Sequence, residues 1–225
     1  MSINKKPISS VQGFLVLLSC LIHLSVIGQT FDPFEARKNI EVKGRMIVVG
    51  NNISGINNLP NNNNSIDNQD VSMEYIDIDN EASTFNSSNA DLVLPVHEDG
   101  TTTSCYRVAY AALYWGAILQ DGDRSTINQV KFKTPGSLNY TDITGEVIYD
   151  AIVNPIVAED NEPGNTPYAC FADITNIMTG LTDIEGTYTM ANVNSSLGFN
   201  YSTGLAAGWT LFVICEDQYL SRQSF

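Results

Sequence analysis

The sequence predicts an all-β fold, a β-sandwich of jelly-roll or immunoglobulin-like Greek-key type. Short segments rich in β-branched and aromatic residues follow one another along the chain, separated by turns that contain Gly, Pro, Asn and Asp. Only one candidate helix interrupts them, residues 173–180, with apolar side chains at helical spacing. A chain of 225 residues is long enough to bury a hydrophobic core.

Two kinds of strand are expected. Segments 71–79, 129–133 and 186–193 alternate apolar and polar residues, which is typical of strands with one buried face. Segments 110–117 and 208–215 are apolar at nearly every position, which indicates central strands covered on both sides. Tyr114, Trp115 and Trp209 are therefore assigned to the core. The alternative, an aromatic surface that stacks on a ligand, needs polar partners that these segments lack.

Four regions are expected along the chain. Residues 1–28 read as a secretory signal peptide, because Lys5 and Lys6 precede an apolar run that is shorter than the roughly 20 residues of a membrane span. Residues 29–50 hold an N-terminal strand, 51–70 an Asn-rich loop or linker, and 71–225 the sandwich module. The chain ends soon after a core strand, so the module is predicted to be truncated at its C-terminus. The mature protein is expected to be exported, with no stable membrane span.

The charge balance limits the partners. The chain carries 11 Lys and Arg against 25 Asp and Glu, a net charge of −14. Nucleic acids and anionic lipids are both bound through Lys and Arg, so neither is expected as a partner.

Three cysteines follow the leader, and export places them in an oxidising compartment. Cys215 lies in an apolar strand and is interpreted as a small buried side chain. Cys105 and Cys170 both adjoin turn-rich segments and are predicted to form the disulfide.

Asp77, Asp79 and Glu81 form the most specific polar cluster. They alternate at the end of a predicted strand, which places three carboxylates on one side where the chain enters a loop. Calcium prefers hard oxygen ligands, so a calcium site is predicted here, with Asp121 and Asp123 as a second, weaker candidate. The alternative is a solvated acidic surface, since the loop lacks the full EF-hand pattern.

Catalysis is not expected. His97 is the only histidine after the leader, it lies in a polar turn, and the G-x-S-x-G motif, a phosphate loop and a dinucleotide fingerprint are all absent. The acidic pairs leave one alternative open, a secreted carbohydrate-active enzyme or a carbohydrate-binding module.

An ordered series of segments resembles the N-terminal region of large, repeat-bearing surface proteins of Bacteroidetes. Such proteins are labelled gliding-motility-associated or adhesin-like and reach the surface by type IX secretion. The resemblance implies an exported module at the cell surface or outside a Gram-negative cell, followed by further β-sandwich repeats, with an unknown glycan or protein as its surface ligand. It lends no catalytic residues. The segments are "STFNSSNADL", "AALYWGAIL", "VKFKTPG", "YACFADIT", "GTYTMANV" and "GLAAGWTLFVICEDQYL".

Overall fold

A computed structural model of the chain describes residues 36–56, 66–97, 100, 105, 107–120, 122–153, 166–200 and 204–225. The predicted signal peptide, residues 1–28, and Asp121 of the second calcium candidate lie outside the described residues. The chain divides into two compact units, Met1–Lys38 and Asn39–Phe225. Only residues 36–38 of the first unit are described, and all that follows concerns the second.

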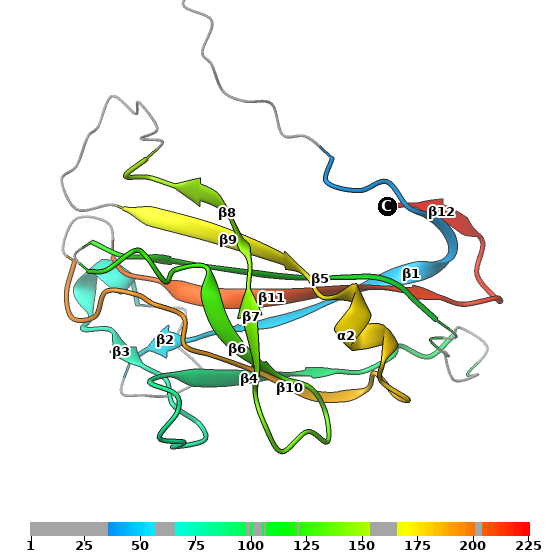
Figure 1. Ribbon diagram of the computed structural model, residues 1–225, viewed down its shortest axis with the longest axis horizontal. Helices are drawn as coiled ribbons and strands as arrows, with labels where there is room; N and C mark the ends of the chain where they lie inside the picture. Colours follow the sequence, from blue (N-terminus) through cyan, green and yellow to red (C-terminus); the bar gives the residue numbers. More distant parts are fainter. Residues whose placement is uncertain are drawn as a thin grey trace, which may run out of the picture. The chain divides into compact units, whose positions relative to one another are not determined.

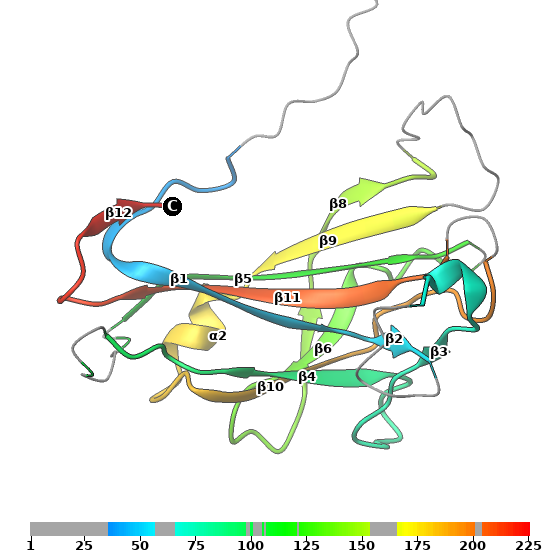
Figure 2. The same cartoon turned by 180° about the vertical axis from the view of Figure 1, so that it is seen from behind.

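The second unit is built on two antiparallel sheets that face each other (Figures 1 and 2) and also contains a two-stranded sheet of β2 and β3, so the prediction of an all-β sandwich fold is confirmed. The six-stranded sheet, here the large sheet, has the order β12-β1-β11-β5-β9-β8, and the four-stranded sheet, here the small sheet, has the order β4-β10-β6-β7. The strands are β1 (Glu41–Asn52), β2 (Ser54–Gly55), β3 (Glu74–Tyr75), β4 (Ser87–Leu92), β5 (Arg107–Ile118), β6 (Gln129–Lys133), β7 (Thr141–Thr144), β8 (Glu146–Asp150), β9 (Pro167–Asp173), β10 (Gly186–Ala191), β11 (Ala207–Glu216) and β12 (Arg222–Ser224).

The helices are short. α2 (Thr175–Thr179) lies inside the predicted segment 173–180, and the carboxylate of Asp173 accepts a hydrogen bond from the backbone N–H of Thr175 at 2.9 Å. The 3-10 helix η1 spans Asn68–Asp70. Within the described ranges, no helix is long and apolar enough to cross a membrane.

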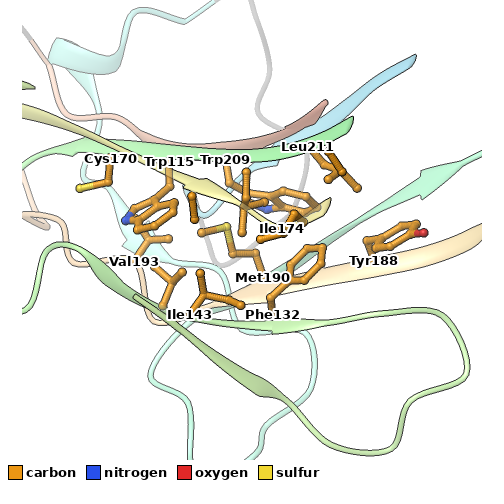
Figure 3. Close-up of a cluster of buried hydrophobic side chains, with 14 of the residues drawn as sticks. Trp115, Phe132, Ile143, Cys170, Ile174, Tyr188, Met190, Val193, Trp209 and Leu211 are labelled. Atoms are coloured by element: carbon orange, nitrogen blue, oxygen red, sulfur yellow. The ribbon is translucent and has the colours of Figure 1, made fainter. Parts of the chain in front are cut away.

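The core lies between the two sheets and is built around two tryptophans (Figure 3). Trp115 of β5 and Trp209 of β11 are directly opposite each other in the strand register, and they are 2% and 3% exposed. Their indole N–H groups donate hydrogen bonds of 2.8 Å to the carbonyl of Ile127 and the hydroxyl of Ser88. Buried indoles need such partners, because an unpaired N–H in the core is costly. The assignment of both tryptophans to the core is confirmed.

Tyr114 lies on the central strand β5 but outside this core, packed against a second, smaller cluster of buried hydrophobic residues, so its assignment holds only in part. Successive strand residues point to opposite faces, so Tyr114 projects from the far side of the large sheet, where it is only half-buried. The apolar pattern of segment 110–117 had predicted cover on both sides. Periodicity detects an apolar side chain but cannot detect whether another layer covers it.

The N-terminal strand belongs to the sandwich. β1 pairs with β11 in an unbroken register from Gly44 to Asn52, and the compact unit starts at Asn39 rather than at residue 71. β1 extends two residues into the segment predicted as a linker, where β2 and η1 also lie, and residues 57–65 fall outside the described chain.

The disulfide joins Cys105 to Cys215, which corrects the predicted Cys105–Cys170 pair. The reason is the long-range pairing of β5 with β11, which places Cys215 opposite Val108 and so brings it to the start of β5. Cys170 lies on β9 opposite Trp115, fully buried in the core with a free thiol. Turn-rich flanks therefore did not identify the pair.

Candidate functional site

The outer face of the large sheet, which points away from the small sheet, is apolar. Directly opposite residues in a sheet share a face, and Val48, Phe212 and Ala112 lie in one such row across β1, β11 and β5. We call this surface the outer apolar face. Its members are Met46 and Val48 of β1, Phe212 and Ile214 of β11, Tyr110, Ala112 and Tyr114 of β5, and Phe171 of β9.

One end of this face is covered by the chain itself. Tyr110 and Ile214 are buried there, packed against Ile40 and Phe225. Towards the β1 edge the side chains are open, since Met46 is 48% and Val48 47% exposed. The outer apolar face is thus covered by Ile40 and Phe225 at one end and exposed to solvent at the β1 edge.

Three half-buried aromatic rings lie in the middle of the face. The ring centroid of Tyr114 is 5.1 Å from that of Phe171 and 5.3 Å from that of Phe212, at interplanar angles of 52° and 73°. These tilted and edge-to-face arrangements are the favoured geometry of packed aromatic side chains. The rings therefore pack against one another and do not form one flat platform.

Beside the rings, glycines leave the sheet hollow. A groove of about 420 Å³ runs over Gly50 and Gly208, and a second of about 310 Å³ continues from Gly208 over Gly116. A Cβ atom on Gly50 would lie 2.2 Å from the carbonyl oxygen of Trp209, and one on Gly116 2.6 Å from that of Tyr168. Side chains are sterically excluded at both positions, so the hollow is maintained by the close approach of neighbouring strands.

The two hollows offer mainly shape and apolar contact to a ligand. Among the described residues that line the two hollows, none carries a charged side chain, and the polar groups are those of Asn51, Asn52, Thr210 and Tyr168 together with an indole and backbone. A surface of this kind can bind a ligand through shape and apolar contact.

The structure does not gather the predicted calcium ligands into one site. Among the residues it describes, no group of three or more His, Cys, Asp or Glu side chains could hold a metal ion. Asp77 accepts hydrogen bonds from the N–H of Asn80 at 3.2 Å and the hydroxyl of Ser87 at 3.0 Å. Glu81 forms an ion pair of 3.2 Å with Lys133.

Asp79 is the most engaged of the three carboxylates. It accepts hydrogen bonds from the Tyr140 hydroxyl, and at 3.2 Å from the Glu81 N–H and the Thr84 hydroxyl. Burial raises the pKa of Asp79, but the hydrogen bonds from Tyr140, Glu81 and Thr84 outweigh it and hold the pKa below its usual range. Burial, followed by the hydrogen bond to Asp79, raises the pKa of Tyr140. The cluster fastens the loop before β4 to the loop before β7.

Local sequence patterns did not reveal two further contacts, a nearly buried ion pair and a His–Asp contact. The guanidinium of Arg124 contacts both carboxylate oxygens of Asp150, at 3.1 and 2.9 Å, and both side chains are nearly buried. Nε2 of His97 lies 3.0 Å from Oδ2 of Asp217, although the two atoms do not meet the angles of a hydrogen bond. His97 is therefore not a solvated loop residue, as the polar turn had suggested. No local pattern links these partners, because each pair is far apart in the sequence.

The free thiol of Cys170 is also unreactive by position. Burial, and then the charge of Asp150, raises the pKa of Cys170 to about 12. The thiol donates a hydrogen bond of 3.4 Å to the carbonyl of Ile127. It contributes to the core and offers no nucleophile at neutral pH.

Comparison with known proteins gives no family for the chain. No protein-family model matches the sequence, and no curated protein shows significant similarity to it.

Proposed function

We propose that the chain is a non-catalytic, exported cell-surface module of a large adhesin-like protein that acts in adhesion or surface display. One observation carries the proposal: a chain of net charge −14 presents an apolar, grooved face on its largest sheet, with the exposed carboxylates of Asp173 and Glu146 towards the β9 and β8 end. An apolar surface that the fold leaves open is typical of a surface that binds a partner.

Three further features support the proposal. The disulfide between Cys105 and Cys215 suits an exported protein, because such bonds persist outside the cytosol. The basic and apolar leader suits export, and the ordered segments resemble surface proteins of Bacteroidetes that use type IX secretion. Further β-sandwich repeats after this module stay a prediction.

Adhesion of coated beads tests the function. The full chain, expressed with its own leader and recovered after export, is coupled to latex beads, which are washed over plates coated with mucin, fibronectin or cellulose. We expect the beads to be retained on at least one coating, and the Tyr114→Ser variant to lose most of that retention. Leu138→Ser, at a position 89% exposed in the loop before β7, is the matched control and should be retained like the wild type. Beads that behave like uncoated beads on every plate would contradict the proposal.

A carbohydrate-binding module is the second candidate, because Tyr114, Phe171 and Phe212 lie beside a groove on a sheet face. Retention on cellulose and mucin but not on fibronectin would favour it. Release of reducing sugar from a soluble polysaccharide would instead indicate a carbohydrate-active enzyme and overturn a purely binding role.

A further inference from the structure

The outer edge of β1 is open over most of its length. β12 pairs with β1 only from Glu41 to Lys43, whereas β1 continues to Asn52. In the part of the chain that the structure describes, no other strand pairs with this edge. Figure 2 shows β1 in front of β11, at the side of the sandwich.

The direction of the backbone groups follows from the bonds at the two ends of the β1–β11 pair. The carbonyl of Lys43 accepts from the N–H of Asp217 at 2.9 Å, and the N–H of Ile53 donates to the carbonyl of Ala207 at 3.0 Å. Odd-numbered residues of β1 therefore bond to β11, and the N–H and C=O groups of Met46, Val48 and Gly50 point to the open edge.

The even-numbered Ile40 is consistent with this assignment. It exchanges two backbone hydrogen bonds, of 3.0 and 2.9 Å, with Phe225, which follows β12 on that same side of β1.

This edge lacks the usual protection against strand pairing. Exposed edge strands are normally blocked by lysine, proline, a bulge or a covering segment. Residues 46–52 contain no charged residue and no proline, and the register between β1 and β11 shows no bulge. Met46 and Val48 are about half exposed beside it.

We infer that this edge pairs with the same edge of a second copy of the chain, antiparallel about a two-fold axis at Val48. The net charge of −14 opposes the association of two copies, so a contact between them is best tolerated at an uncharged surface such as this edge. A two-fold contact also requires a surface that complements itself.

The sequence of the edge meets that requirement. With Val48 opposite Val48 of the second copy, each Met46 lies opposite a Gly50, so a long side chain is matched with the absence of one. The residues of each such pair exchange both backbone hydrogen bonds, because all have their N–H and C=O groups on the open side. The pairing joins two large sheets into one and aligns the two outer apolar faces side by side. The inferred dimer does not depend on the proposed adhesive function.

Sedimentation of the exported full chain tests the inference. We expect a monomer–dimer equilibrium between about 1 and 100 µM, because assembly of this kind depends on concentration. Val48→Lys places two like charges directly opposite each other and should weaken the dimer about tenfold or more. Val147→Lys is the matched control, since Val147 is 41% exposed on β8, the strand at the other end of the large sheet. It should dimerise like the wild type, and both variants should melt like the wild type.

Cysteine cross-linking tests the register. Paired residues of this type have Cα atoms about 5.5 Å apart, within disulfide range, so Val48→Cys should form a covalent dimer under mild oxidation. Met46→Cys, equally exposed, should not, because the two introduced thiols lie four residues out of register. A wild-type chain that is monomeric at all concentrations, an unaffected Val48→Lys dimer, or equal cross-linking by the two cysteine variants would each overturn the inference.

Discussion

The two sheets differ in the faces that they turn away from the core. On the small sheet the outward residues are polar, as in the row of Asp91, Thr187 and their neighbours, where the Thr187 hydroxyl donates to Asp91 at 2.6 Å. On the large sheet the outward residues are mostly apolar, as in the row of Val48, Phe212 and Ala112, which ends at Asp173 of β9. Both sheets bury their inner faces in the same core.

The stability of the sandwich explains the apolar inner faces of both sheets but not the outer apolar face of the large sheet. A sandwich needs only its inner faces to be apolar, and the small sheet meets that need with the usual alternation in β6 and β10. The outer apolar face goes beyond that need. Met46 and Val48 contribute little to the free energy of folding, because their side chains remain about half exposed. The apolar character of the outer face is therefore not explained by the needs of the core, which is consistent with the proposed binding role.

The largest effect is expected at Trp115, on the inner face. Trp115→Ala should lower the free energy of unfolding by about 3–5 kcal/mol, because it opens a cavity in the core. Urea denaturation measures the change. The adjacent outer-face variant Tyr114→Ala is the control and should cost clearly less, and equal losses at the two positions would show that both faces are structurally equivalent.

Removal of the disulfide should cause the second-largest loss of stability. Cys105→Ser should cost about 2–5 kcal/mol, because the bond closes a loop of 110 residues in the unfolded chain. Cys170→Ser is the control for the corrected pairing, since it removes a buried thiol without breaking the Cys105–Cys215 bond. Mass spectrometry of the non-reduced wild-type protein should recover a peptide pair that joins Cys105 to Cys215, and a pair containing Cys170 would contradict the structure.

An intermediate loss of stability is expected when Asp79, in the polar cluster beside the small sheet, is replaced. Asp79→Asn should cost about 1–2 kcal/mol at neutral pH, since three donors lose a charged acceptor. Because folding lowers the pKa of Asp79, its contribution is present above the usual value of 3.8 and is lost as the pH falls through the lower value of the folded protein. Thermal melting from pH 7 to pH 2 should therefore show a smaller acid-induced loss in the variant.

The same melting experiment tests calcium. The carboxylates of Asp77, Asp79 and Glu81 already accept bonds from protein groups, so we expect a chelator to leave Tm nearly unchanged. An ion bound only by the folded protein would raise Tm with concentration, and such a rise would restore the site predicted from the sequence.

The smallest effects should occur on the two outer faces. Met46→Gln and Lys131→Gln should each change the free energy of unfolding by no more than about 0.5–1 kcal/mol, the first because the site is half exposed and the second because its ion pair with Asp142 is solvated. Urea denaturation of both variants checks this. A large loss of stability in Met46→Gln would show that the outer apolar face is needed for folding, and it would contradict the distinction between the two faces of the large sheet.

Local patterns predicted the fold class well and its long-range pairings poorly. The alternation of Val130 and Phe132 and the continuous apolar segments around Trp115 and Trp209 identified the strands and the core. The Cys105–Cys215 bond, the His97–Asp217 contact and the outward position of Tyr114 depend on which strands are neighbours, which period and composition do not encode. The outer apolar face did leave a signal, the missing alternation of β5 and β11, and that signal was interpreted as a covering layer.

The Cys105–Cys215 bond also limits how far the chain can be stretched. Ile40 and Phe225 lie side by side, so a force pulling them apart opens the β1–β12 pair one residue at a time. Once the pulling reaches the disulfide, the chain between the two cysteines, a sequence separation of 110, cannot extend, which withholds roughly 360–400 Å of contour length. Under mechanical load the module would thus lengthen only by the residues outside this loop, which include β1 to β4 and β12, and β5 to β10 and β11 up to Cys215 would remain within the covalently closed loop.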